Sequence, residues 1–457
     1  MLGYALLWLR SALSTMSGYV TWLLHIPVLF FLAGSAATQS GTLSSRDGVY
    51  NSSMTPADLP WNTYNYCNAP HVNARHYARP ANAPHAKLVY MNAVIRHHKE
   101  NELNAIPWNC ADFPQFSYGG GSASAQIFHN TDVPSWHPFL SLFWNGTCDE
   151  GQLTHEGLLD SIAHGKDFWG VYGGELGFLE SVNEGDIFVR TSVETRTMQV
   201  AGGFIAGMDP AFVSKAFPVT TQPSPIDSIP PNYPCPNANA IRDAYQSVPA
   251  WTAHLAQNAA LKARLDATLG TAGLADWASW YDHFFDTFTS RTCHGHPLPC
   301  NATGGCVSAA DAARVFAIGD FEYNYIWNAA ENATAYNQLT VGVFLQELAQ
   351  NFRLFRDGGE RFRLRFYVGH DGTMVRVASA LGFGKLAPLR WPALGSEIVM
   401  EVGWLPVGCL WLGWRTDDGN WGIVAVVPGF KWIPLDTFIE ALEAQIPDDI
   451  FEACNSA

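Results

Sequence analysis

Positive charge is scarce in this 457-residue chain, and charged residues of either sign make up only 15% of it. Its 26 Lys and Arg residues are outnumbered by 41 Asp and Glu residues, so the formal net charge is −15. A surface of that composition offers no basic field for a polyanion, which argues against nucleic acid or an anionic membrane as the principal partner. A phosphorylated small molecule stays compatible, because a single basic pocket can bind it. No repeat of fixed period occurs, which argues against a solenoid.

Charge is entirely absent from residues 11–45, where the apolar run 19–33 is followed by small residues up to Ala37. This run is shorter than the ~20 residues that a membrane-spanning helix needs. We therefore predict that residues 1–37 are a secretory signal peptide, cleaved near Ala36 or Ala37. The alternatives are an uncleaved N-terminal anchor and a buried N-terminal helix. Only an uncleaved segment would make a membrane a partner of this protein.

Cysteine, in contrast, is plentiful beyond this leader. The nine cysteines are Cys67, Cys110, Cys148, Cys235, Cys293, Cys300, Cys306, Cys409 and Cys454, and Asn-X-Ser/Thr sequons occur at Asn51, Asn145, Asn301 and Asn332. Leader, sequons and cysteines together predict a secreted, extracellular glycoprotein with disulfide bonds. The alternative location is anchored to a membrane of the secretory pathway. Because nine is odd, at least one thiol is free, buried or in an intermolecular bond.

Three of these cysteines lie in one loop, 293–306, together with His294 and His296. Cysteines and histidines at such spacing are compatible with a zinc site. In a secreted chain a disulfide is the favoured interpretation.

Hydrophobic residues make up 48% of the chain, which is enough to bury a large core and excludes disorder as the main state. Residues 38–85 predict an extended lead-in, and the pattern then predicts an α/β fold with helices between strands. The predicted strands are 88–95, 186–193, 362–368, 397–402, 410–414 and 423–427, with a hairpin turn at 416–420. The predicted helices are 153–179, 197–208, 251–269, 277–288, 309–329, 336–356, 373–381 and 435–445.

Polar residues that could bind an anion directly follow two of these strands. Arg96-His97-His98-Lys99 follows strand 88–95, and His370-Asp371 follows strand 362–368. Ligand-binding groups of open α/β sheets gather at the carboxyl ends of strands. A solvated basic loop and an ordinary helix-capping Asp are the alternatives for these two motifs. Arg190 and Arg196 lie around strand 186–193, where lone arginines are most often surface groups.

Four short motifs, in this order, resemble those of the histidine phosphatase superfamily, in its acid phosphatase and phytase branch. They are Arg96-His97, Leu153-Thr154-His155-Glu156-Gly157, Arg196-Thr197 and His370-Asp371. The lead-in Tyr64-Asn65-Tyr66-Cys67-Asn68 also resembles a fungal secreted, phosphoglycerate mutase-like subgroup. The resemblance covers about residues 61–446. It implies a three-layer α/β sandwich with a mixed central sheet over 86–457, and an α-helical cap inserted at about 210–358.

The resemblance also implies a metal-independent acid phosphatase mechanism without a cofactor. His97 would attack phosphorus and form a phosphohistidine. Arg96, Arg196 and His370 would bind the phosphoryl oxygens, and Asp371 would protonate the leaving oxygen. All five side chains should then converge on one pocket that holds a phosphorylated small molecule.

Glu100 departs from this pattern, because it stands where the resemblance implies a second phosphate-binding arginine. Losing that cation removes a charge-assisted hydrogen bond of ~1.5–3 kcal/mol. The carboxylate adds a repulsion of about 3 kcal/mol at ~6 Å. Together these could slow turnover about a thousandfold. Lys99, His98, Arg190 or protonation of Glu100 could compensate, and we expect Glu100 at the rim of the pocket.

Three alternatives to a secreted phosphomonoesterase follow from the same residues. The first is a non-catalytic or weakly active phosphate-ligand-binding glycoprotein of the same fold, for which Glu100 is the best argument. The second is a metal-dependent hydrolase using His97, His98, His370 and Asp371, although adjacent histidines do not easily share one ion. The third is a mutase. Secretion and the His-Asp motif favour hydrolysis.

Overall fold

The computed structural model describes residues 48–50, 52–79, 85–101, 151–404, 421–425 and 433–456, with residues 421–425 described as backbone alone. All of these residues belong to one compact unit that begins at Leu43. Several sequence-based expectations fall outside the described residues. They are the leader 1–37, the strand 410–414, the turn 416–420, Cys110, Cys148, Cys409, Asn51 and Asn145.

A mixed sheet forms the centre of the described part of the chain. Its six strands follow the order β2-β3-β1-β4-β5-β6. Their bounds are β1 Lys87–Arg96, β2 Ile187–Thr191, β3 Leu364–Gly369, β4 Glu397–Trp404, β5 Trp421–Ala425 and β6 Ile433–Pro434. Strands β2, β3 and β1 are parallel, whereas β4 is antiparallel to β1. The carboxyl ends of the three parallel strands therefore meet at one edge of the sheet.

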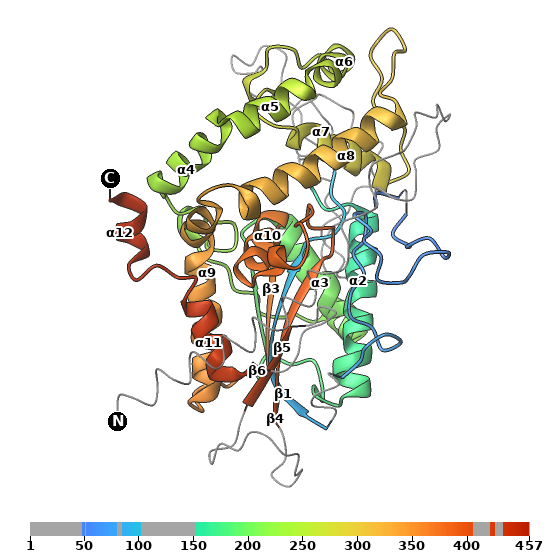
Figure 1. Ribbon diagram of the computed structural model, residues 1–457. Helices are drawn as coiled ribbons and strands as arrows, with labels where there is room; N and C mark the ends of the chain where they lie inside the picture. Colours follow the sequence, from blue (N-terminus) through green and yellow to red (C-terminus); the bar gives the residue numbers. More distant parts are fainter. Residues whose placement is uncertain are drawn as a thin grey trace, which may run out of the picture. The chain divides into compact units, whose positions relative to one another are not determined.

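Helices cover both faces of this sheet (Figure 1). On one face α2 (His155–Trp169) and α3 (Thr195–Met208) bury Phe168 and Phe204 against Phe366 of β3. On the other face α9 (Ala333–Arg356), α10 (Asp371–Ala380) and α11 (Leu435–Glu443) pack against residues such as Tyr90 and Val94 of β1. Strand β1 is buried along nearly its whole length, as its unbroken apolar run predicts. The three-layer α/β sandwich with a mixed sheet is thus confirmed.

Helices also fill the connection between α3 and β3, where the sequence predicts a helical insertion. They are α4 Pro236–Ser247, α5 Pro249–Gln257, α6 Ala259–Leu269, α7 Asp282–Cys293, α8 Ala309–Asn324 and α9. The later helix α12 (Ile450–Asn455) packs against α4. The boundaries of a cap at about 210–358 stay a proposal, and α9 at its end belongs to the layer on the sheet.

Two expected helices of this insertion differ from those observed. The predicted helix 251–269 is wrong as a single element, because α5 ends and α6 begins around Asn258. The Asn258 side-chain amide donates to the carbonyl of His254 at 2.9 Å, which competes with continued helix formation. The predicted helix 277–288 is displaced, since Trp277 ends a short 3-10 turn and α7 begins at Asp282.

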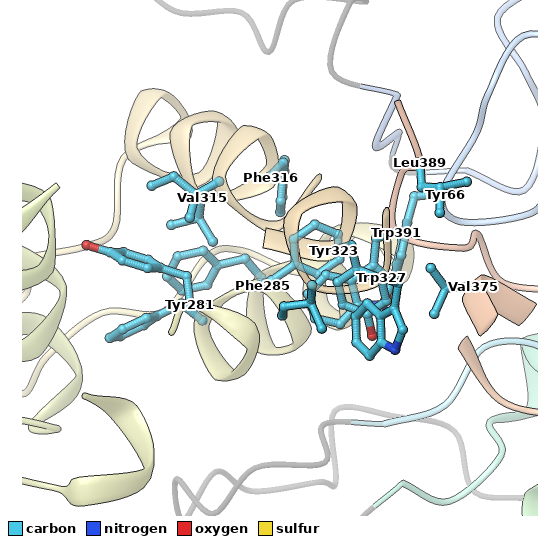
Figure 2. Close-up of a cluster of buried hydrophobic side chains, with 14 of the residues drawn as sticks. Tyr66, Tyr281, Phe285, Val315, Phe316, Tyr323, Trp327, Val375, Leu389 and Trp391 are labelled. Carbon is cyan, nitrogen blue, oxygen red and sulfur yellow. The ribbon is translucent and has the colours of Figure 1, made fainter. Parts of the chain in front are cut away.

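An aromatic cluster joins α7 and α8 to the segment that precedes β4 (Figure 2). Trp391 stacks on Phe285 of α7 and on Tyr323 of α8, and each pair of ring centroids is 3.9 Å apart. The insertion is thereby fixed to the sheet domain next to the ends of β1 and β3.

Among the described residues, no helix is long and apolar enough to cross a membrane.

Candidate active site

Two histidines face each other where β1 and β3 end. The backbone N–H of His97 donates to the carbonyl of Gly369 at 3.0 Å and so extends the parallel β1–β3 ladder by one residue. His370 follows Gly369 directly and precedes α10. The imidazole rings of His97 and His370 have their centroids 5.3 Å apart. Both motifs therefore lie at the same edge of the sheet, as expected from their positions at the ends of two strands.

The tautomer of His97 follows from its hydrogen bond. Its Nδ1 lies 3.0 Å from the carbonyl oxygen of His98, which can only accept, so Nδ1 carries the proton and Nε2 keeps its lone pair. Burial lowers the pKa of His97 well below its usual value, and the positive charges of Arg96 and Arg196 lower it further. Burial therefore favours the neutral ring, which keeps its lone pair on Nε2.

Arg96 is buried at the end of β1 and lies at the bottom of the site. Its guanidinium donates to the Tyr66 hydroxyl at 3.2 Å and to the carbonyl of Pro392. Its Nη2 lies 3.3 Å from Oδ2 of Asp371. Within the described part of the chain, the buried Nε of Arg96 has no hydrogen-bond partner. A buried donor without a partner is expected where a ligand oxygen binds.

Arg196 and Ser192 hold His370 from the side of α3. Arg196 donates from Nη2 to His370 Nδ1 at 3.4 Å, and His370 Nε2 lies 2.9 Å from Ser192 Oγ. Because Arg196 can only donate, the proton of neutral His370 is on Nε2 and is directed to Ser192. Burial and the charge of Arg196 lower the pKa of His370 to about 3. His370 is therefore a neutral ring at physiological pH.

Asp371 begins α10 and faces Arg96. The indole Nε1 of Trp391 donates to its Oδ2 at 2.7 Å, and the Gly372 N–H donates to its Oδ1. Burial alone would raise the pKa of Asp371, but Arg96 and the bond from Trp391 outweigh it, so the pKa is lowered. The side chain keeps 26% of its surface exposed, more than those of Arg96, Arg196 and Glu100.

Glu100 lies deeper than the rim where the sequence places it. Its side chain is only 5% exposed, and its Oε2 is 3.0 Å from Nε of Arg196. Its Oε1 is 3.5 Å from Nε2 of His97 and 3.8 Å from Nη2 of Arg96. Burial raises the pKa of Glu100 to about 8, although both arginines act in the opposite direction. The carboxyl group thus occupies the space between the arginines and Nε2 of His97.

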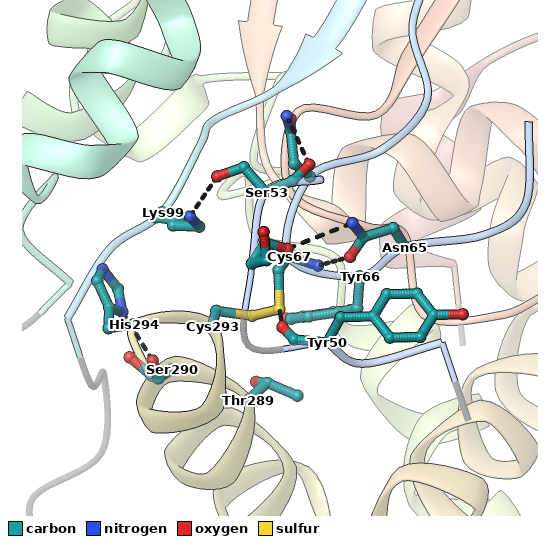
Figure 3. The surroundings of a disulfide bond; sticks show 12 residues. Tyr50, Ser53, Asn65, Tyr66, Cys67, Lys99, Thr289, Ser290, Cys293 and His294 are labelled. Carbon is teal, nitrogen blue, oxygen red and sulfur yellow. Dashed lines mark hydrogen bonds between the residues drawn. A yellow bond between two sulfur atoms is a disulfide. The ribbon is translucent and has the colours of Figure 1, made fainter. Parts of the chain in front are cut away.

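The other residues suggested as compensating groups bind elsewhere. Lys99 binds Ser53, Glu156 and Asp160 at the side of α2, with Nζ–O distances between 2.6 and 3.3 Å. Its place beside Ser53 is visible in Figure 3. The Lys99 charge is therefore directed away from the space beside His97.

His98 and Arg190 are buried in other networks as well. His98 Nε2 is 3.2 Å from Nδ1 of His164, which in turn contacts Glu397. Arg190 on β2 pairs with Asp227 at 2.8 Å and with Glu347 of α9. Because His98 points toward His164, it is not placed to share an ion with His97, His370 and Asp371. No group of three or more metal-ligating side chains is arranged for an ion among the described residues.

The Leu153–Gly157 motif supports the loop that carries Glu100. The Thr154 side chain accepts from the Gly157 N–H at 3.2 Å and so caps α2, while the Thr154 N–H donates to the Lys99 carbonyl at 3.0 Å. A Cβ on Gly157 would lie 2.1 Å from that carbonyl oxygen. Only glycine allows this close approach, so the motif positions residues 97–100 rather than touching a ligand.

A disulfide bond ties the lead-in to α7 beside this loop. Cys67, which follows Tyr66, is bonded to Cys293 of α7 (Figure 3). On the same helix, the Ser290 hydroxyl donates to the Glu100 carbonyl at 3.0 Å. Cys300 is bonded to Cys306, and Cys235 to Cys454. The favoured disulfide interpretation of the loop 293–306 is therefore confirmed over zinc, although Cys293 pairs outside the loop.

Sequence reasoning did not identify Ser192 or Trp391 as site residues. Ser192 follows β2 directly, and the same strand-end argument could have found it. No signal in the sequence relates Trp391 to Asp371, because their contact depends on the packing of α7 and α8 around the indole ring.

The sequence matches the family model of the histidine phosphatase superfamily (branch 2) over residues 75–407. Lysosomal acid phosphatase of Bos taurus is 26% identical over 67% of this chain and 73% of its own length. Counting factor 60 of Dictyostelium discoideum is 23% identical over 69% and 74% of the two chains. Two solved phytase structures share the fold, each at 13% identity. The phytase from Hafnia alvei has a TM-score of 0.52, and the match covers 82% of this chain and 99% of the phytase. The phytase from Citrobacter braakii has a TM-score of 0.53, and the match covers 81% of this chain and 100% of the phytase. The chain belongs to branch 2 of the histidine phosphatase superfamily.

Proposed function

We propose that this protein is a metal-independent phosphomonoesterase of the acid phosphatase type that works through a phosphohistidine on His97. The observation that carries the proposal is the Nε2 lone pair of His97, which lies between the guanidinium groups of Arg96 and Arg196, with only the Glu100 carboxyl group beside it. A neutral imidazole with its other nitrogen fixed to a carbonyl is a preorganised nucleophile. The substrate class is a phosphorylated small molecule, as the acid phosphatase and phytase relatives suggest.

In the first step His97 Nε2 attacks phosphorus, and the bond from phosphorus to the ester oxygen breaks. Arg96 and Arg196 surround the phosphoryl oxygens, whose negative charge persists through the transition state, and His370 joins them when the substrate replaces its hydrogen bonds to Ser192 and Arg196. Asp371 gives its proton to the departing oxygen, so the alcohol leaves neutral. In the second step water attacks phosphorus, Asp371 takes back a proton, and inorganic phosphate and free His97 are formed.

Protonation of Glu100 is the condition for this reaction. As an anion beside His97 Nε2, the carboxylate competes with the phosphoryl group for the same arginines. As a neutral carboxyl it no longer repels the substrate and can donate one hydrogen bond to a phosphoryl oxygen. A raised pKa keeps Glu100 neutral in the acidic range. In the same range a larger fraction of Asp371 is protonated and can donate to the leaving group.

The same placement of Glu100 favours a second candidate function. If Glu100 remains between the arginines and His97 when substrate is present, the protein binds phosphorylated ligands weakly and turns them over slowly or not at all. Purified protein assayed with p-nitrophenyl phosphate, with and without a chelator, tests both candidates. Chelator-insensitive turnover that His97→Ala abolishes supports the enzyme, and absence of turnover at every pH from 3 to 8 refutes it.

We also propose that the mature protein begins after about Ala36 and passes through the secretory route. The disulfides of the described residues support this, as does the exposed sequon residue Asn332. Glycosidase digestion of protein secreted by a eukaryotic host should lower its apparent mass, and N-terminal sequencing should begin near residue 37. Recovery of unglycosylated, full-length protein from the cytosol would contradict this proposal.

A further inference from the structure

The Trp391 side chain binds Asp371 from the segment that precedes β4. The indole Nε1–H of Trp391 donates to Asp371 Oδ2 at 2.7 Å, which is a short bond for a nitrogen donor. Asp371 is the residue that the proposed function makes the proton donor, and the following inference rests on that function. The orientation of its two oxygens decides whether a proton reaches the leaving group.

The indole ring of Trp391 is itself fixed by the helical insertion (Figure 2). Phe285 of α7 stacks on it with the ring planes 6° apart, and Tyr323 of α8 stacks on it at 27°. The backbone N–H of Trp391 donates to Asp320 of α8 at 3.0 Å, and its carbonyl accepts from the Tyr64 hydroxyl at 2.8 Å. The N–H is therefore held in one direction, toward Asp371.

We propose that Trp391 is a positioning residue for the proton donor: its indole N–H holds the Asp371 carboxyl group in the orientation that serves the leaving oxygen, and its ring couples that orientation to the position of α7 and α8. Trp391 acts through Asp371, whose Oδ1 is bound by the Gly372 N–H. The consequence is that the identity of the leaving group decides how much Trp391 matters.

Several charged or titratable groups face Asp371 and set its protonation together with Trp391. Arg96 from β1 and the adjacent His370 favour the ionised form, while Glu100 and the hydroxyls of Tyr66 and Tyr323 lie within electrostatic reach. Burial favours the neutral form, and Arg96 and the Trp391 hydrogen bond outweigh it. Loss of the indole N–H should therefore raise the pKa of Asp371.

The same aromatic cluster contains a matched control. Trp327 is also buried, packs on Tyr323 with ring centroids 4.6 Å apart, and contributes a comparable apolar surface. In the described part of the chain its indole Nε1 has no hydrogen-bond partner. Trp327→Phe and Trp391→Phe therefore remove similar volumes from the same cluster, but only the second removes a hydrogen bond to Asp371.

The test compares these two variants on two substrates. p-Nitrophenolate leaves without a proton, whereas the alkoxide of glycerol 2-phosphate must be protonated as it leaves. For Trp391→Phe we expect kcat on glycerol 2-phosphate to fall about tenfold or more, and kcat on p-nitrophenyl phosphate to fall much less. The alkaline limb of the pH profile should move upward by about one unit, because a hydrogen bond to a charged group is lost. Trp327→Phe should show neither change.

Equal losses on both substrates, or the same behaviour in the two variants, would overturn the inference while leaving the phosphatase proposal intact. A direct readout needs no turnover. The indole ¹⁵N–¹H resonance of Trp391, assigned by its absence in Trp391→Phe, should shift with pH as Asp371 titrates, and Asp371→Asn should abolish that shift. A resonance that does not respond to pH in the folded protein contradicts the inference even if the protein proves inactive.

Discussion

Glu100 Oε2 lies 3.0 Å from Nε of Arg196. Glu100 stands at the position where the family pattern places a second arginine. An internal carboxyl group thus lies against the cation to which the proposed function assigns phosphate binding. In the described part of the chain neither of these two atoms has a hydrogen bond of good geometry, although both are buried. An ion pair without hydrogen bonds is more easily opened than a bidentate one, and the proposed function requires that a phosphoryl group replace the carboxyl group here.

Replacing Glu100 by arginine should raise kcat/KM for p-nitrophenyl phosphate and move the pH optimum upward. Above pH 8, where Glu100 is ionised, the gain could reach about a thousandfold, because a repulsion of about 3 kcal/mol and a missing charge-assisted bond are both reversed, whereas at lower pH only the added bond contributes. Glu100→Gln should recover part of it, since it removes the charge without adding a cation. Steady-state kinetics from pH 3 to 9 measures both variants.

Unchanged kinetics in both variants, with an active wild type, would contradict the contact between Glu100 and the phosphoryl group. An inactive wild type and an active Glu100→Arg protein would instead favour the non-catalytic function. Arg190→Met is the control, because Arg190 is bound by Asp227 and Glu347 and should affect stability without moving the pH optimum.

Anion binding should weaken above the pKa of Glu100, which burial raises to about 8. Below that pH the carboxyl group is neutral and a dianion binds without repulsion. Above it Glu100 is ionised, and the dissociation constant should rise up to about tenfold per pH unit, because binding then requires uptake of one proton. Sulfate is the suitable probe, since it stays a dianion from pH 5 to 9.5, and calorimetry gives its dissociation constant.

Glu100→Gln supplies the control for sulfate binding. Its side chain has no proton to lose, so its affinity for sulfate should be constant across the same pH range. A wild-type curve that is equally flat, or a variant curve that bends at the same pH, would show that Glu100 does not control access to the arginines.

The fold follows from sequence more fully than the site does. The apolar run of β1 and the polar residues after β1 and β3 predict a strand-end site, because parallel strands end at a common edge. Glu100 could not be placed in this way, since its depth depends on how the loop after β1 folds over α2. Arg190 was equally ambiguous: its charge is buried only because Asp227 and Glu347 come from distant parts of the chain.

Gly157→Ala should impair the site from a distance. Its Cβ would lie 2.1 Å from the Lys99 carbonyl oxygen, so the loop 97–100 must shift. We expect a loss of stability of ~1–3 kcal/mol and a loss of activity in the protein that remains folded. Denaturant unfolding gives the first quantity, and kcat/KM of the folded fraction gives the second.

Gly202→Ala on α3 is the matched control, because nothing lies within 4 Å of the added Cβ. In a helix this change should be neutral or stabilise the protein by up to about 1 kcal/mol. Similar behaviour of the two variants would refute the role assigned to Gly157.

The phosphoryl group on His97 is the central claim, and trapping it is the most direct measurement. Protein mixed with ³²P-labelled phosphomonoester and quenched in alkali should retain label in an acid-labile, alkali-stable form. Peptide mapping should place that label on His97, and His97→Ala should carry none. Turnover of the wild type without trapped label, or label that persists in His97→Ala, would contradict the mechanism.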